Sequence, residues 1–181
     1  YEICLSDWSS DVCSSDLSYG GDYSFTHCTF NNNWSSSNQV AVSISNYITG
    51  AIPEVKDLNA ATFNNCIIYG SYSNEMILNK KTGAAFEYQF NNCLLKFDNA
   101  SNSFTTNPDY QFNTDATHYN AILLNKSPKF LNVNQNKLTI DTSSPAFAKG
   151  DSAFTIPLDI IGNTRTLPPD LGAYQSMPFP E

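Results

Sequence analysis

The sequence predicts an all-β solenoid, a fold in which successive coils of one chain stack on each other. Three observations favour this class. Charged residues make up only 14% of the 181 residues, against about 25% in an average domain. The polarity comes instead from Asn, Ser and Thr, which favour turns and short strands over helices. Short apolar runs, broken by Asn or Gly, recur without convincing helical periodicity.

The charge pattern excludes some partners. The net charge is −8, and no cluster of Lys and Arg is present to contact phosphates, so we expect no nucleic-acid binding. No stretch reaches the roughly 18 apolar residues of a membrane span, and no signal peptide is visible. We expect a monomer without a membrane span.

Residues 1–17 differ from the rest of the chain. They show neither strand alternation nor a helical face, and the tail from Trp8 to Leu17 resembles translated sequencing-adapter read-through at the broken end of a gene fragment. The alternative is a genuine Ser-rich linker. We expect residues 1–17 to lie outside the fold, and the natural N-terminus to be missing. Without them the acid count falls from 17 to 13, against 9 bases, a net charge of −4.

The repeat consists of one hexapeptide pattern that recurs three times. Its Cys-to-Cys spacings of 38 and 27 residues suit solenoid coils. A weaker run at Val40–Asn46 suggests an extra coil within the first interval, and another occurs at Ala121–Asn125. The three copies are Phe25-Thr26-His27-Cys28-Thr29-Phe30, Phe63-Asn64-Asn65-Cys66-Ile67-Ile68 and Phe90-Asn91-Asn92-Cys93-Leu94-Leu95.

The repeat has a physical interpretation. The Phe, the Cys and the last apolar residue point inward, and the residue before Cys makes a bend. Asn tolerates the left-handed backbone that such a bend requires. Stacked coils place equivalent residues about 4.8 Å apart. We therefore expect Asn65 and Asn92 to form a ladder of side-chain amides, with His27 at the same place in an earlier coil.

The cysteines of the repeat are predicted to be core residues. Buried Cys behaves as a small apolar residue, and side chains in parallel register suit the torsion of a disulfide poorly. A disulfide between Cys66 and Cys93 is the alternative for an exported protein. No Cys-x-x-Cys spacing is present, so we expect no zinc site and no other metal or cofactor.

The repeat resembles the right-handed parallel β-helix proteins, the architecture of pectate lyases and many bacterial surface proteins. The chain ends with three short motifs, Ser144-Pro145-Ala146, Asp159-Ile160-Ile161-Gly162-Asn163-Thr164-Arg165 and Pro169-Asp170-Leu171-Gly172-Ala173-Tyr174. This ending is similar to that of the choice-of-anchor Q surface proteins, although Gln175 stands where that family often has an acid. The resemblance implies coils over residues 18–140, a closing segment over 141–181, and an extracellular or outer-membrane location with any anchor upstream, for example as a lipoprotein.

The closing segment is expected to cap the open end of the solenoid. Its prolines cannot extend a strand ladder, and an uncovered end invites aggregation. Arg165 stands between Asp159 and Asp170 and is expected to pair with one of them. The alternative makes Asp159 and Asp170 calcium ligands, although calcium needs six to eight oxygens.

The sequence names no catalytic residue. His27 occupies the bend position of the repeat and is expected to be structural, while His118 lies in a loop without a partner motif. No Gly-x-Ser-x-Gly motif is present. The carboxylates Asp98, Asp109, Asp115 and Asp141 are scattered over predicted loops, and sequence alone does not bring two of them to glycosidase spacing.

Two further groups of residues bear on carbohydrate chemistry. Resemblance to lyases of this fold implies a Lys or Arg base on an outer face, with Lys80, Lys81 and Lys96 as candidates. Outward-facing aromatic residues would stack on sugars, and the candidates are Trp34, Tyr47, Tyr69 and Tyr72. The simpler interpretation is that the lysines lie in exposed positions and the aromatic residues shield the sheet.

Three functions remain open from sequence. The first is a non-catalytic extracellular module that binds polysaccharide. The second is the C-terminal part of a polysaccharide lyase or glycoside hydrolase whose active coils lie upstream. The third is a structural stalk without a ligand. No ligand-binding residue is identified by the sequence, and the substrate-binding site stays unknown at this stage.

Overall fold

The computed structural model describes residues 15–33, 39–49 and 54–179. Strands dominate these residues, and the helical elements are three short 3-10 turns, η1 (Pro108–Tyr110), η2 (Val133–Gln135) and η3 (Ser152–Phe154). The strands are β1 (Ser15–Leu17), β2 (Gly21–Thr26), β3 (Thr29–Asn32), β4 (Val42–Ser45), β5 (Tyr47–Ile48), β6 (Glu54–Val55), β7 (Leu58–Asn64), β8 (Ile67–Gly70), β9 (Met76–Asn79), β10 (Gln89–Asn91), β11 (Leu94–Leu95), β12 (Tyr119–Asn120), β13 (Leu123–Leu124), β14 (Phe130–Asn132) and β15 (Lys137–Ile140).

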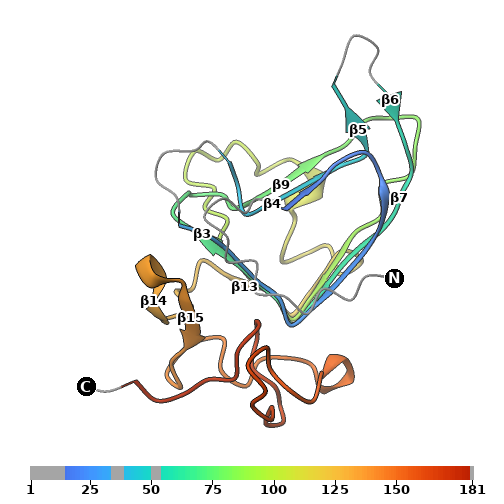
Figure 1. The fold of residues 1–181 in the computed structure, drawn as a ribbon. Coiled ribbons are helices and arrows are strands. Elements are labelled where there is room, and N and C mark those ends of the chain that lie inside the picture. The colour runs from blue at the N-terminus through green and yellow to red at the C-terminus, as the bar shows by residue number, and fades with distance from the viewer. Residues whose placement is uncertain (1–14, 34–38, 50–53, 180–181) are drawn as a thin grey trace.

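Three parallel sheets surround a common core (Figure 1). The β7 sheet has the order β12-β10-β7-β2, the β8 sheet has the order β13-β11-β8-β3, and the β4 sheet has the order β1-β4-β9. Consecutive strands such as β7, β8 and β9 belong to three different sheets, so each pass of the chain visits one sheet after another. The all-β class with parallel sheets is confirmed, and the right-handed β-helix stays a prediction.

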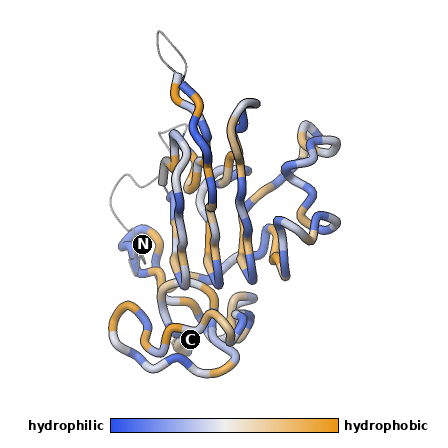
Figure 2. The backbone as a smooth tube through the Cα atoms, turned by 90° about the vertical axis from the view of Figure 1, so that its right-hand side faces the viewer, coloured by the Kyte–Doolittle hydropathy of each residue, from blue (hydrophilic) through white to orange (hydrophobic). Residues whose placement is uncertain are grey.

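The strand register places the repeats directly on one another. Phe63 pairs with Phe25 on one side and Phe90 on the other, and Phe90 pairs with Tyr119 in the last pass. In the β8 sheet, Ile68 likewise lies between Phe30 and Leu95. Figure 2 shows these passes running side by side. Equivalent residues of the three hexapeptides therefore stack in columns, as the repeat predicts.

A left-handed residue joins the β7 sheet to the β8 sheet in every pass. The backbone φ is 55° at His27, 55° at Asn65, 50° at Asn92 and 52° at Ala121. Asn adopts this conformation more readily than most residues because its short polar side chain bonds locally. The bend predicted at this position of the repeat is confirmed, and Ala121 shows that the register holds even without an Asn.

Stacked aromatic rings and thiols fill the space inside the bend. The ring of Phe63 lies 4.8 Å from that of Phe25 and 4.6 Å from that of Phe90, nearly parallel to both. Cys28, Cys66 and Cys93 are buried, and Cys66 and Cys93 are not joined by a disulfide. Burial raises the pKa of the Cys66 thiol well above its ordinary value. The cysteines thus serve as small core residues, and the disulfide alternative is wrong for this pair of coils.

The predicted ladder forms in part. Asn65 Nδ2 lies 3.2 Å from Nε2 of His27, as predicted, whereas the amide-to-amide bond lies one residue earlier, where Asn91 Nδ2 donates to Oδ1 of Asn64 at 2.9 Å. Asn65 and Asn92 also bond the backbone of the C-terminal segment, which we define as residues 126–179: Asn65 Nδ2 donates to the Asp151 carbonyl at 3.0 Å and Asn92 Nδ2 to the Lys149 carbonyl at 3.0 Å.

The run at Val40–Asn46 does not form an extra coil, contrary to prediction. It supplies β4, the third side of the first pass, and pairs in parallel with β9. The first pass is longer because an antiparallel hairpin of β5 and β6 follows β4. In the third pass the residues after β11 form a loop whose Phe104, Tyr110 and Phe112 cluster with Phe97.

The boundary at residue 17 is also corrected. The backbone of β1 (Ser15–Leu17) pairs in parallel with β4, and Leu17 lies opposite Ile44 with its side chain buried. A parallel ladder accepts any chain with an apolar residue at the inward position. Residues 1–14 lie outside the described residues.

The C-terminal segment covers a side of the sheets rather than their open end. Its residues Ile140, Ala146 and Leu171 pack on Ile67 and Leu94, which point outward from the β8 sheet. Figure 1 shows this segment, in orange and red, beside β3 and β13 of that sheet. Gly172 has a φ of 85°, and a side chain there would meet Oγ1 of Thr29 at 2.5 Å. The predicted end cap is thus a lateral cover.

We expect Phe63→Ala to destabilise the protein strongly. The substitution removes a fully buried ring that stacks on two others, and such truncations lower the free energy of unfolding by about 3–5 kcal/mol. The matched control is Phe147→Ala in the C-terminal segment, where the ring is 40% exposed and the change should stay within about 1 kcal/mol. Urea denaturation measures both, and equal losses would contradict the stacked column.

Candidate functional site

The first candidate site is a shallow concavity of about 250 Å³ on the outer face of the β7 sheet. Strand alternation turns Thr62 and Gln89 outward because their neighbours Phe63 and Phe90 point into the core. Residues around these strands complete the wall with hydroxyl, amide and carboxylate groups. The lining residues are Asn59, Ala60, Ala61, Thr62, Glu87, Tyr88, Gln89, Thr117 and His118.

A His–Asp pair borders this concavity. Nδ1 of His118 lies 2.6 Å from Oδ2 of Asp115, and its ring stacks on Tyr88 with the centroids 4.2 Å apart. Burial alone would raise the pKa of the Asp115 carboxyl. The hydrogen bond and charge of His118, together with the backbone N–H groups of Thr117 and His118, outweigh that effect and hold the pKa below its ordinary value.

The pair orients a ring without completing a catalytic set. An aspartate that accepts from Nδ1–H fixes the tautomer and orientation of an imidazole. Glycoside hydrolysis by the common mechanisms needs two carboxyl groups about 5–10 Å apart across the bond. Among the described residues, Asp115 is the one of the four scattered carboxylates that bonds His118. His118, which the sequence placed in a loop without a partner motif, thus has its partner three residues earlier in the chain.

The other three scattered acids lie in separate surroundings. Asp141 accepts from the backbone N–H groups of Ser143 at 2.7 Å and Phe179 at 3.0 Å. The carbonyl of Asp109 accepts from the hydroxyls of Tyr88 and Tyr119. Asp98 is exposed in the loop after β11. These three residues do not gather around one point.

The three lysines proposed as bases lie apart from the concavity. Lys81 sits over the ring of Tyr47, with Nζ 4.2 Å from the centroid, and Lys96 over that of Tyr69, at 5.9 Å. Lys80 lies near Phe86, on the same exposed turn as Lys81.

The aromatic residues do not form one sugar-stacking face. Tyr69 packs against the cluster under the C-terminal segment, whereas Tyr47 belongs to the β5–β6 hairpin and Tyr72 to the turn after β8. Trp34 lies outside the described residues. The simpler interpretation, that these rings shield the sheets, fits Tyr69.

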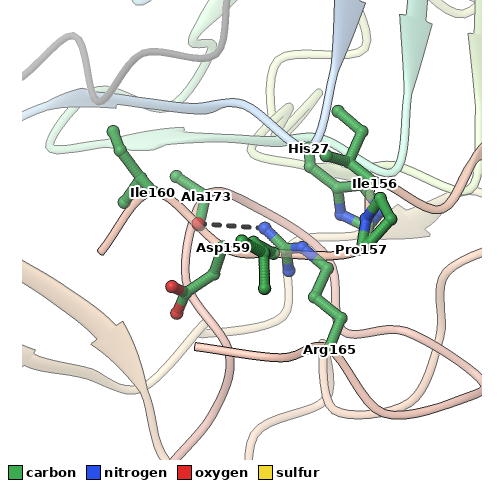
Figure 3. Close-up of a pocket in the computed structure, with 8 residues that line it drawn as sticks. His27, Ile156, Pro157, Asp159, Ile160, Arg165 and Ala173 are labelled. Atoms are coloured by element: carbon green, nitrogen blue, oxygen red, sulfur yellow. Dashed lines mark hydrogen bonds between the residues drawn. The ribbon is translucent and has the colours of Figure 1, made fainter. Parts of the chain in front are cut away.

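A second cavity, of about 410 Å³, lies between the C-terminal segment and the bend at His27 (Figure 3). Arg165 is buried there and donates from Nη2 to the carbonyls of Gly172 and Ala173, both at 2.9 Å. Burial lowers the pKa of the Arg165 guanidinium, and the charges of Asp159 and Asp170 oppose that shift. The predicted salt bridge is not formed: within the described residues, no carboxylate lies in ion-pair contact with Arg165.

Both oxygens of each aspartate accept hydrogen bonds from N–H groups instead. Asp170 accepts from the backbone of Ala148 at 2.7 Å and Ser176 at 2.8 Å. Asp159 accepts backbone N–H groups on both oxygens, including Asn163 at 2.7 Å and Gln175 at 2.9 Å. Oxygens so occupied are poor calcium ligands, because a cation would have to displace donors. The shaping role predicted for Asp159 and Asp170 is therefore favoured over the calcium alternative.

A third buried acid, Glu75, is not marked by any motif in the sequence. Its carboxylate accepts from the Asn32 amide and the Ala41 backbone, both at 3.0 Å, and from the Tyr72 backbone at 2.8 Å. Burial raises the pKa of Glu75, although these hydrogen bonds oppose the shift. Glu75 thus links the turn before β9, which contains Tyr72, to Asn32 and Ala41 in the previous pass of the chain. Nothing in its local sequence distinguishes it from an exposed acid.

Across residues 15–33, 39–49 and 54–179, no three His, Cys, Asp or Glu side chains gather as a metal site, and no helix has the length and apolarity to cross a membrane. Comparison of the chain with protein-family models, with curated proteins and with solved structures found no match. The resemblance to choice-of-anchor Q proteins stays a prediction.

We expect His118→Ala to raise the pKa of Asp115. The substitution removes the bond and charge that favour the ionised carboxyl, so the pKa should move upward toward 3.8, its ordinary value. Carbon-detected NMR titration of the carboxyl groups measures the shift. Asp141, which has no contact with His118, is the internal control. An unchanged Asp115 would show that the pair is not formed in solution.

Proposed function

We propose that the chain forms coils of a right-handed parallel β-helix in an extracellular or cell-surface protein, and that the outer face of its β7 sheet binds polysaccharide. The observation that carries this proposal is the polar concavity on that face. Amide, hydroxyl and carboxylate groups are the partners that sugar hydroxyls need. The parallel register of three sheets supports the β-helix.

The contrast between two sheets strengthens the choice of face. The β8 sheet presents Ile67 and Leu94 outward, and the C-terminal segment covers them. The β7 sheet presents Ser24, Thr62 and Gln89 in one row, and Ser24 and Gln89 are exposed. A row of small polar side chains across parallel strands offers evenly spaced hydrogen-bonding groups, which suits a repeating polymer.

The charge of the face favours uncharged glycans. Glu87 lines the concavity, Asp115 borders it, and no Lys or Arg is among its described lining residues. A uronate polymer such as pectin or alginate would place carboxylates against these acids, and like charges repel. We therefore infer neutral polysaccharide as the ligand class.

Two other functions remain as alternatives. The chain is the C-terminal part of a polysaccharide lyase or glycoside hydrolase, with active coils upstream, or it is a stalk without a ligand. The His118–Asp115 pair is the one feature that favours the enzyme alternative. The separation of Lys80, Lys81 and Lys96 from the concavity weighs against a lyase here.

We expect Gln89→Ala to weaken binding of a neutral polysaccharide by about fivefold to tenfold, the usual effect of losing a hydrogen bond in a binding site. The matched control is Gln135→Ala, at an exposed position of η2 in the C-terminal segment, which should leave affinity unchanged. Isothermal titration calorimetry against a panel of soluble neutral and acidic polysaccharides measures both. Equal affinities for the two variants would contradict the proposed face, and a panel without any binder would favour the stalk.

We also expect no turnover of pectin, alginate or neutral polymers. A general base contributes about 10²–10⁴-fold only when it contacts the reacting proton, and none of the three lysines lines the concavity. Ultraviolet detection of unsaturated uronates tests lyase activity, and a reducing-sugar assay tests hydrolase activity. Turnover that disappears in His118→Ala, or in the Lys80, Lys81 or Lys96 alanine variants, would restore the enzyme alternative.

A further inference from the structure

The cavity beside Arg165 has the size and walls of a small-molecule pocket. Its volume of about 410 Å³ falls within the roughly 300–1,000 Å³ typical of ligand sites. Ile156, Pro157, Leu158 and Ile160 supply apolar walls. Leu158 and Ile160 are 51% and 37% exposed, which is high for apolar side chains and places them at the rim.

Buried donors without acceptors lie beside this apolar space. Arg165 is only 7% exposed, and its Nε and Nη1 have no hydrogen-bond partner. Its Nη2 is already bonded to Gly172 and Ala173, and Figure 3 shows the guanidinium among the residues that line the cavity. Leaving buried donors of a charged group unpaired is unfavourable, so an acceptor placed there would be stabilising.

The charges around the guanidinium decide what kind of acceptor fits. Burial, and then the charge of Arg165, lower the pKa of His27 to about 3, so this ring is neutral. The charges of Asp159 and Asp170 already act on the Arg165 guanidinium. In Figure 3 the Asp159 carboxylate points away from the guanidinium. A ligand carboxylate would add a third negative charge, and an ammonium group would bring no acceptor to Arg165.

We propose that this cavity binds a small, uncharged and largely apolar molecule that carries a carbonyl or similar oxygen acceptor, with the oxygen directed at Arg165. This site is separate from the polar face of the β7 sheet and does not depend on glycan binding there. Nε and Nη1 are shielded from solvent in the structure, so the wall side chains must shift on binding. Changes of rotamer at a binding surface are common.

The test compares three eight-carbon probes that differ in their polar group. These are 2-octanone, octanoate and n-octylammonium, each titrated into the full chain by saturation-transfer NMR. We expect 2-octanone to bind about tenfold or more tightly than either charged probe, a ratio consistent with one extra hydrogen bond to a charged donor. Equal or tighter binding of either charged probe would overturn the assignment, as would no binding of 2-octanone.

A matched pair of variants locates the site. Ile160→Trp places a large ring in the cavity wall, whereas Ile161→Trp changes the next residue, which is 66% exposed and does not line the cavity. We expect Ile160→Trp to weaken 2-octanone binding about tenfold or more and Ile161→Trp to leave it unchanged, with circular dichroism confirming that both fold. Equal effects of the two variants would refute this location.

Discussion

The left-handed bend between the β7 and β8 sheets is the constraint on which the rest of the structure depends. It recurs at His27, Asn65, Asn92 and Ala121 with φ between 50° and 55°. An L-residue in this conformation turns the chain sharply within one position, so the residues before and after it enter different sheets. Equivalent bends must then stack, because a slip of one residue would move every inward side chain to the outer face.

The same bend anchors the C-terminal segment. Side chains at the bend leave the strand ladder and become available on the outside, where Asn65 and Asn92 bond the backbone at Asp151 and Lys149. His27 occupies the equivalent place beside the cavity of Arg165. The stacked left-handed bends thus align the aromatic rings inside the sheets, and they also supply the side chains that hold the C-terminal segment on the outside.

The repeat predicted much of the fold because its signal is local and periodic. The bend, the Phe column and the buried cysteines follow from six consecutive residues in each pass. The extra coil was wrong because an apolar run such as Val40–Asn46 does not reveal which sheet it joins. The role of Arg165 was missed in part because sequence proximity to Asp159 and Asp170 suggested a pair, whereas backbone N–H groups occupy both carboxylates. His118 and Asp115, three residues apart in one loop, offered a signal that a search for motifs passes over.

The passes differ in length on one side only. A six-residue unit around each bend keeps one spacing in every pass, namely Phe25–Phe30, Phe63–Ile68, Phe90–Leu95 and Tyr119–Leu124. The intervals from Phe25 to Phe63 and from Phe63 to Phe90 are 38 and 27 residues. The hairpin of β5 and β6 and the aromatic loop before β12 both fall on the remaining side. Foreign peptides grafted at that side would leave the bends and the inner columns in register, so the chain is a natural scaffold for displaying loops of unrelated length.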